Sequence, residues 1–291
     1  MLFRSAPGGA IDAYARVVSE HMAQTLGRSI IIENKPGASS NLAAQFVVDQ
    51  PADGATVMVG TMAVNEINPH IFEHPRWSPK DFLPLIKGVE APLLFTTHPD
   101  VPAKTFDEFL TWARANKGKL TYSSYSPGTP SHFLGALLNE KFALDLGHVP
   151  YRGSAPQTVD LLAGHAKFGF TQVQGVLQQA QAGKLRVLGV TTQGRFGQMK
   201  DVPSFTELGH PEFTAGIWFG LLVRATTPAP VATRLLEAAR AAHADTKVRE
   251  ALVAQGFDVS GQTGEAFAKS IEEGSARWAK LVNATGFKAT D

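Results

Sequence analysis

What this sequence lacks excludes several classes of function. It contains no cysteine among its 291 residues, which excludes disulfides, thiol catalysis and thiolate metal sites together. The absence of cysteine fits an exported and a cytosolic protein equally well. Charge of neither sign is in excess, because 27 lysines and arginines accompany 26 aspartates and glutamates. A nucleic-acid-binding surface usually shows a basic excess, so we expect no nucleic-acid partner.

Long apolar runs and common catalytic signatures are also missing. No stretch approaches the roughly 18 uninterrupted apolar residues of a membrane-spanning helix. The nucleophile elbow G-x-S-x-G, the dinucleotide fingerprint G-x-G-x-x-G and the phosphate loop G-x-x-x-x-G-K-[ST] do not occur. We therefore expect no nucleotide cofactor and no nucleophilic serine enzyme.

The sequence contains one match to a metal-binding motif. Residues His70 to His74 match H-x-x-E-H, a zinc motif that needs both histidines on one face of a sustained helix. Pro69 and Pro75 bracket these residues, so at most one helical turn can form there. The pattern indicates a surface turn, and we expect no metal and no other cofactor.

The N-terminus leaves room for only a stub of strand. Met1 to Arg4 runs almost at once into Pro7-Gly8-Gly9, without the charged, apolar and small-residue segments of a signal peptide. We expect either that a leader was removed or lies upstream, or that the start of the gene is shortened.

Apolar residues make up 44% of the chain, and they follow alternating strand and helix patterns. Strands are predicted at 29–33, 56–59, 93–97, 120–123, 148–150, 168–171, 185–190 and 217–223. Helices are predicted at 12–26, 42–48, 106–113, 131–142, 154–163 and 176–182, followed by three late helices, the last at about 265–284. A capping box, Thr105-x-x-Glu108, opens the third of them. This alternation predicts an α/β fold with parallel sheets flanked by helices.

Several loops between strands and helices are rich in glycine and hydroxyl residues. They include Gly8 to Asp12, Thr129 to Ser131 and Ser154 to Gln157, each just before a predicted helix. Each loop alone is an ordinary helix cap. A helix start offers unpaired amides and the positive end of the helix dipole, so several such loops together favour an anion-binding cleft without a formal positive charge.

The ordered set of motifs resembles the Bug family, the periplasmic solute-binding receptors of tripartite tricarboxylate transporters. The opening segment Pro7-Gly8-Gly9 with Asp12 and the turn Glu33 to Ala38 followed by Asn41 carry this resemblance. Each segment is weak alone, but their order and spacing cover nearly the whole chain. The other matching segments are 53–54, 60–61, 68–69, 80–82, 127–132, 148–156, 183–186 and 218–220.

The resemblance implies a two-domain fold of the periplasmic-binding-protein type (type II style). Each domain would be a mixed, mostly parallel sheet flanked by helices, with a hinge and a ligand cleft between the domains. Residues 1–97 and 224–291 would form the first domain, and residues 98–223 the second. The ligand would be a small carboxylate, either a di- or tricarboxylate or an aromatic carboxylate. The protein would be periplasmic and would serve membrane permease subunits. We expect a monomer, because nothing in the sequence resembles an oligomerisation seam.

Family contacts can be carried over to particular positions of this sequence. Asp12 is expected to cap its helix or to orient a water, because an ionised carboxylate cannot bond another carboxylate. The expected ligand-binding residues are Gly9, Ala10, Asp12, Thr61, Asn65, Thr129, Ser131, His132, Ser154, Ala155, Thr171 and Gln172.

This chain departs from the family pattern at two places. Arg4 and Ser5 stand where the family usually has Pro-Phe, which would widen the pocket and add a fixed charge. Residues Thr171 to Gly175 stand where the family often has an acidic residue before Asn-x-x-Ser. Without that acid an ammonium loses its partner, so a plain carboxylic acid is favoured over an amino acid.

Two other functions are open at this point. One is a small α/β enzyme that acts on a carboxylate with His132 as general base, and the other is a ligand sensor that feeds a signalling partner. His132 begins a predicted helix, where the dipole disfavours the imidazolium, so we expect a neutral ring. We expect Arg152 on the surface and Trp218 as a packing residue.

Overall fold

The computed structural model describes residues 2–3, 9–35 and 37–289 and divides into two compact units. Unit 1 comprises Met1–Glu90 and Trp218–Asp291, and unit 2 comprises Ala91–Ile217. The chain passes from one unit to the other along β4 (Phe82–Thr97) and returns along β9 (Gly216–Arg224). The boundaries expected from the sequence, after residues 97 and 223, lie at the ends of these two strands.

The sheet of unit 1 is mixed. Its strands are β2 (Glu33–Asn34), β1 (Leu2–Phe3), β3 (Met58–Thr61), β9, the first part of β4, and β10 (Asp258–Thr263), which pairs with β4. Strand β1 is parallel to β2 and β3, whereas β9 is antiparallel to β3 and β10 is antiparallel to β4. The carboxyl ends of β1, β2 and β3 therefore meet at one edge of the sheet, where α/β proteins bind their ligands.

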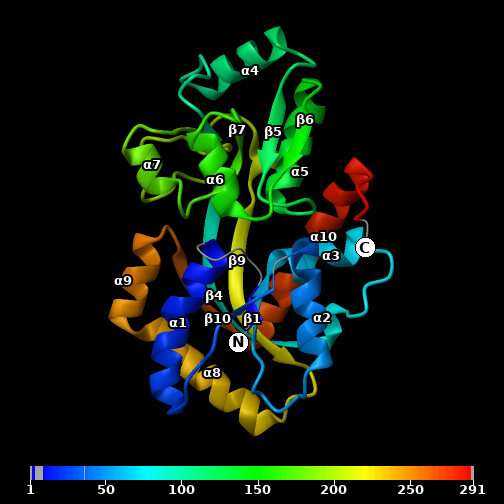
Figure 1. Cartoon of the computed structure of the whole chain (residues 1–291), viewed down its shortest axis with the longest axis vertical. Coiled ribbons are helices and arrows are strands. Elements are labelled where there is room, and N and C mark those ends of the chain that lie inside the picture. Colours follow the sequence, from blue (N-terminus) through cyan, green and yellow to red (C-terminus); the bar gives the residue numbers. More distant parts are fainter. Residues whose placement is uncertain (1, 4–8, 36, 290–291) are drawn as a thin grey trace. The chain divides into compact units, whose positions relative to one another are not determined.

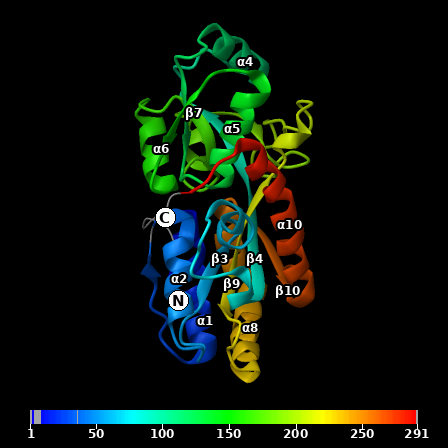
Figure 2. The ribbon, with the colours of Figure 1, turned by 90° about the vertical axis from the view of Figure 1, so that its right-hand side faces the viewer.

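Helices follow each of these parallel strands. They are α1 (Ala10–Leu26) after β1, η1 (Ala38–Ser40) and α2 (Asn41–Asp49) after β2, and η2 (Ala63–Ile67) and α3 (Asn68–Ile71) after β3. A short η3 (Pro79–Asp81) precedes β4, and α8 (Ala229–Ala244), α9 (Thr246–Ala254) and α10 (Gly264–Thr285) complete the unit. Helix α1 packs on α8 and α9 (Figure 1), and α10 packs on η2 and β10 (Figure 2).

Helix α1 shows how the apolar pattern sets the packing. Tyr14, Val18 and Met22 recur every four residues and are buried on the face that meets α8. Gly27 ends the helix in the left-handed conformation, with φ 65°, as the sequence predicted.

The strand predicted at 29–33 is wrong. Only Glu33 and Asn34 pair with a neighbour, and Ile31 is 80% exposed. Residues 29–33 are exposed or half-buried, so no burial holds this apolar run in the sheet. Strand β10 was not predicted from the sequence.

The sheet of unit 2 is mixed in the same way. Its strands run in the order β4, β7 (Phe168–Gln172), β5 (Thr121–Ser124) and β6 (Gly147–Pro150), and β8 (Arg186–Val190) also pairs with β4. Strand β5 is parallel to β6 and β7, and β4 is antiparallel to β7 and β8. The carboxyl ends of β5, β6 and β7 thus share one edge. The helices are α4 (Phe106–Ala115), α5 (Pro130–Phe142), α6 (Ser154–Leu162), α7 (Leu177–Gln181) and η4 (Pro211–Phe213).

A cluster of phenylalanines forms the core of unit 2. The ring centroids of Phe95 and Phe109 are 4.8 Å apart, as are those of Phe109 and Phe168, and both pairs pack edge to face. The predicted capping box of α4 forms only in part. Thr105 Oγ1 accepts from the Glu108 amide at 3.2 Å, but the Glu108 carboxylate accepts from the amide of Lys104 and not from that of Thr105.

Both units have the mixed α/β architecture that the sequence predicted, with helices around each sheet, so the predicted fold class is confirmed. No helix in the described part of the chain combines the length and apolarity needed to cross a bilayer.

A buried tyrosine–histidine pair joins α1 to α8. His243 Nδ1 lies 2.8 Å from the carbonyl oxygen of Ala239, so that nitrogen carries the proton and Nε2 accepts from the Tyr14 hydroxyl at 3.1 Å. Gly88 on β4 leaves the room for this pair, since a Cβ there would overlap both side chains.

Replacing Tyr14 by phenylalanine should lower the free energy of unfolding by about 1–3 kcal/mol, because His243 Nε2 becomes a buried acceptor without a donor. Urea unfolding measures the loss. Tyr151→Phe is the matched control, since it removes a hydroxyl that bonds Asp160 on a half-buried residue of unit 2. Equal losses in the two variants would contradict this account of the buried pair.

Candidate functional site

In the part of the chain that the structure describes, the N-cap position of α1 provides no side-chain cap. Its N-cap residue is Gly9, with extended backbone angles, and both Gly9 and Ala10 are buried. Helix α1 follows β1, so its first-turn amides lie at the carboxyl edge of the unit 1 sheet. The N-cap residue offers them no side-chain acceptor. Such a helix start is suited to an anion. Pro7 and Gly8, which the motif includes, lie outside the described residues, as do Arg4 and Ser5.

Asp12 is bonded to two other side chains at the start of α1. Its buried carboxylate accepts a bidentate pair from Arg16, with Nε at 2.9 Å and Nη2 at 3.0 Å, and a bond from Asn34 Nδ2 at 3.3 Å. Asp12 thus ties the turn after β2 to the first turn of α1 and positions this edge of the sheet.

Thr61 and Asn65 lie where β3 ends. Asn65 Nδ2 donates to the carbonyl of Thr61 at 3.0 Å, and both residues are buried. Asn65 belongs to η2, a single π-helical turn from Ala63 to Ile67. Such turns interrupt regular helices and often accompany functional sites.

Ser39 and Ser40 form a third loop at this edge that the sequence analysis missed. Both adopt left-handed backbone angles, with φ 49° and 76°, and both are buried. Asn68 holds them in place by donating from Nδ2 to the Ser39 carbonyl at 2.7 Å. The sequence feature that could have predicted this loop is the pair of hydroxyl residues directly before the helix predicted at 42–48.

In unit 2, Thr129 and Ser131 begin α5. The Thr129 hydroxyl donates to the Ser126 carbonyl at 2.6 Å, and the Ser131 hydroxyl donates to the Phe170 carbonyl. Thr129 is the N-cap residue, but its side chain makes no capping bond to α5. The two hydroxyls therefore fix the loop, and the first-turn amides lack a capping side chain, as in α1.

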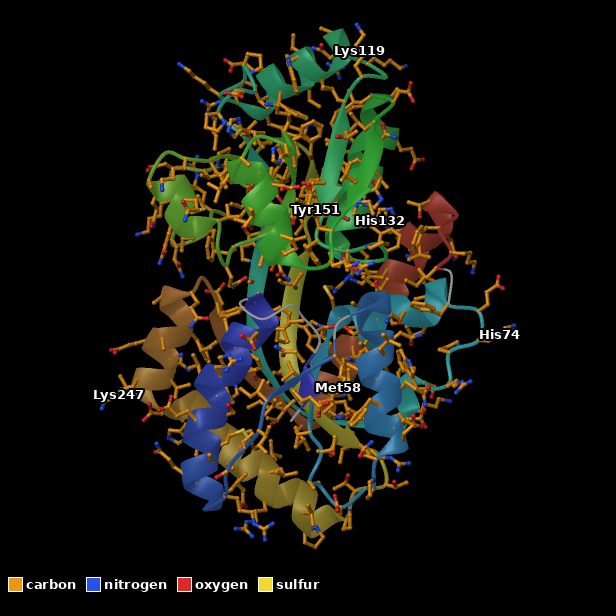
Figure 3. All side chains as sticks on the ribbon, viewed as in Figure 1. Met58, His74, Lys119, His132, Tyr151 and Lys247 are labelled. Atoms are coloured by element: carbon orange, nitrogen blue, oxygen red, sulfur yellow. The ribbon has the colours of Figure 1, made fainter. Side chains whose placement is uncertain are left out.

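His132 stands in a stack of three rings, and Figure 3 labels it. Its ring lies 4.3 Å from that of His148, which in turn lies 4.7 Å from that of Tyr122. Burial lowers the pKa of both histidines to about 4, and His148 adds charge repulsion at His132. Because the Gly128 amide donates to Nδ1 of His132 at 3.2 Å, the neutral ring carries its proton on Nε2. The lowered pKa agrees with the predicted neutral His132, but its cause is burial and not the helix dipole, and the two stacked rings were not predicted.

Ser154 and Ala155 form the first turn of α6. Gly153 precedes them with φ 128°, a conformation that requires glycine, and its amide donates to the Tyr125 carbonyl at 2.8 Å. Ser154 is buried, whereas Arg152 is exposed, as the sequence predicted. This third helix start also has no side-chain cap.

Thr171 and Gln172 are the last residues of β7. The Thr171 hydroxyl is bonded inside the sheet, 2.7 Å from that of Thr96, and both Thr171 and Gln172 are buried. Gln157, which was not predicted, donates from Nε2 to Ser123 Oγ at 3.0 Å and to the Phe170 carbonyl at 3.3 Å. Gln157 thus joins α6 to the Phe170 carbonyl, which also accepts the hydrogen bond from the Ser131 hydroxyl.

The surface turn predicted at 70–74 forms only in part, since the segment begins as the end of α3 and Ile71 and Phe72 are buried. Helix α3 ends at Ile71, His74 is exposed, and His70 Nε2 lies 2.8 Å from Ser275 Oγ. Among the described residues no group of histidines and acids is placed to hold a metal ion.

Solved structures similar to this chain include periplasmic binding proteins, such as the one titled BugD, and proteins with small carboxylates bound. The Rpa4515 protein of R. palustris with adipate is 26% identical, with coverage of 99% of this chain and 97% of that chain and a TM-score of 0.93. MatC (Rpa3494) from Rhodopseudomonas palustris with bound malate is 28% identical, with coverage of 97% and 98% and a TM-score of 0.90. By its fold this chain is a solute-binding receptor.

The family follows from the sequence. The profile described as "Tripartite tricarboxylate transporter family receptor" matches residues 14–287, and the chain belongs to that family. Protein BugT from Bordetella pertussis is 28% identical over 97% of this chain and 87% of its own length. The resemblance to the Bug family is confirmed, and because these proteins are receptors, the hypothesis of an enzyme with His132 as general base is wrong.

Proposed function

We propose that this receptor captures a small carboxylate with backbone amides and hydroxyls at the carboxyl edge of each sheet. The observation that carries the proposal is the set of three helix starts without a side-chain cap, in α1, α5 and α6. A hydrogen bond to a charged group contributes about 1.5–3 kcal/mol. Five or six such bonds would give roughly 10 kcal/mol before ordering costs, enough for an affinity near micromolar.

The ligand class within this proposal is a di- or tricarboxylate or an aromatic carboxylate. Two solved relatives carry adipate and malate, which supports a carboxylate with at least one further polar group. The expected residues are those of the first-turn loops, with Thr61, Asn65, Thr171 and Gln172. Ser39 and Ser40 are added from the third loop of unit 1.

We further propose that the protein works as a periplasmic monomer whose two units close on the ligand and deliver it to membrane permease subunits. Family membership supports the transport context. Co-purification with a permease would support delivery, whereas co-purification with a sensor kinase would favour the alternative role as a ligand sensor.

A thermal-shift screen of refolded, ligand-stripped protein tests the function. The panel contains succinate, malate, citrate, adipate and benzoate, with aspartate and glutamate alongside. A ligand at 100 times its dissociation constant stabilises the native state by about 2.7 kcal/mol, which gives a clear rise in melting temperature. A rise with one carboxylate class is the expected result. A flat screen would contradict the proposal.

A proline substitution isolates the helix-start amides. Ala10→Pro removes one first-turn amide of α1 at a position where a helix tolerates proline, so affinity should fall about tenfold or more with the helix intact. Thr246→Pro is the matched control, because it makes the same change at the first residue of α9, which the side chain of Asp245 caps. Equal affinity in the two variants would remove α1 from the site.

A further inference from the structure

Glu66 is a buried acid directly beside the candidate site of unit 1. It follows Asn65 in the π-helical turn η2, and it is 2% exposed. Its Oε1 accepts from the indole nitrogen of Trp218 at 2.6 Å, whereas its buried Oε2 has no hydrogen-bond partner. An ionised carboxylate is costly where one of its oxygens is shielded from water and unbonded.

The packing around this carboxyl leaves it little freedom. Gly274 on α10 faces it, and a Cβ at that position would overlap the carboxyl atoms. The ring of Phe267, also on α10, packs edge to face on Trp218 with centroids 5.1 Å apart. Helix α10 thus packs on η2 and surrounds the Glu66 carboxyl with glycine backbone and aromatic rings. Such surroundings favour a neutral carboxyl group.

Charged groups on the neighbouring elements do not neutralise Glu66 by direct pairing. Arg277 on α10 and Lys87 on β4 act on it through space, and Glu90 on β4, which pairs with Lys87, opposes them. From α3, His70 bonds Ser275, the residue after Gly274. Burial outweighs the Trp218 bond and the two cations and raises the pKa of Glu66 to about 7.

We propose that Glu66 is a proton-binding site coupled to carboxylate capture, so that the receptor takes up a proton when it takes up its ligand. The proposal rests on the proposed function, because it needs an anion at Thr61, which ends β3, and at Asn65, which precedes Glu66 in η2. Like charges disfavour each other, so an anion bound at Asn65, the residue before Glu66, favours the protonated acid. By linkage, the protonated acid favours the anion by the same factor.

The protonation of Glu66 sets the direction in which ligand affinity changes with pH. Raising the pH through about 7 removes the proton from Glu66, and the receptor then binds a carboxylate more weakly. Release of the ligand would be favoured where the pH is high, and capture where it is low.

Calorimetric titration of the same five carboxylates at pH 6 and pH 8 tests the coupling. We expect about fivefold or more weaker binding at pH 8, and proton uptake seen as a dependence of the binding heat on the buffer's ionisation enthalpy. Glu66→Gln keeps the shape and an acceptor for Trp218, and it should remove both effects. The di- and tricarboxylates of the panel change their own charge near pH 6, so the test is the difference in pH dependence between wild type and the glutamine variant.

Two control variants separate Glu66 from its surroundings. His70→Asn removes a second titratable side chain that contacts α10, and Glu20→Gln removes an exposed acid on α1. Both should keep the wild-type pH dependence. Equal wild-type affinity at the two pH values, or pH dependence unchanged by Glu66→Gln, would overturn the coupling. Absence of binding at both pH values would instead overturn the proposed function.

Discussion

Replacing Gly169 by alanine should lower the free energy of unfolding by about 3 kcal/mol. Gly169 on β7 lies opposite Ser123 on β5, and an added Cβ would overlap the carbonyl oxygen and Oγ of Ser123. The carbonyl belongs to the backbone, so no side-chain rotation relieves the overlap and the two strands must move apart. Urea unfolding followed by circular dichroism measures the loss.

Gly197→Ala is the control for this substitution. A Cβ at Gly197 meets no atom within 4 Å, so its effect should stay within about 0.5 kcal/mol. Similar losses in the two variants would mean that loss of glycine itself, and not the contact with Ser123, sets the result.

Replacing Glu66 by glutamine should make the protein increasingly more stable than wild type as the pH rises. The folded-state pKa of Glu66, about 7, lies above its ordinary value of 4.5, so the folded state holds this proton more tightly than the unfolded state does. Stability from this group is complete below pH 4.5 and falls as the pH rises to about 7. Glutamine does not titrate, so the difference between variant and wild type should change by about 3 kcal/mol in its favour across this interval.

The measurement is urea unfolding of both proteins from about pH 4 to pH 8. The variant must be compared with wild type at each pH, because other titratable groups change the free energy of unfolding in the opposite direction. Burial lowers the pKa of His132, His148 and His243, so their contribution to stability is lost as the pH falls below their ordinary value of 6.5. A constant difference between variant and wild type at every pH would show that Glu66 titrates normally in the folded protein.

Much of the fold could be predicted from periodicity. The apolar spacing of Tyr14, Val18 and Met22 and the stop at Gly27 define α1 within two residues of its observed start. The failures lie where pairing partners decide the outcome. The isoleucines before Glu33 form no strand although their apolar run predicts one, and β10 forms by pairing with β4.

The candidate site was predictable only in part, for a physical reason. Helix starts are visible in a sequence because glycine, proline and hydroxyl residues mark them, so the starts of α1, α5 and α6 were found. Contacts between distant segments leave no such mark. The stack of His132 on His148 and the bond of Gln157 to the Phe170 carbonyl depend on how strands and helices lie in unit 2.

Glu66 shows the same limit more clearly. In the sequence it is one glutamate in an apolar segment, without a neighbouring base or motif. Its character comes from Trp218 and Gly274, which are far away along the chain. Only packing turns it from an ordinary acid into a group that holds a proton near neutrality.

The passage of the chain through β4 and β9 has a consequence for biosynthesis. In the sheet of unit 1, β9 lies between β3 and β4, and α10 closes η2, so unit 1 cannot be completed until nearly the whole chain has left the ribosome. Unit 2 is one continuous segment, Ala91–Ile217, and can be complete much earlier. Because domains generally fold as units during synthesis, unit 2 is expected to fold first, while the leading 90 residues wait for their partners. Those waiting residues, which include the amphipathic helix α1, are the part of the nascent chain that most needs protection from aggregation.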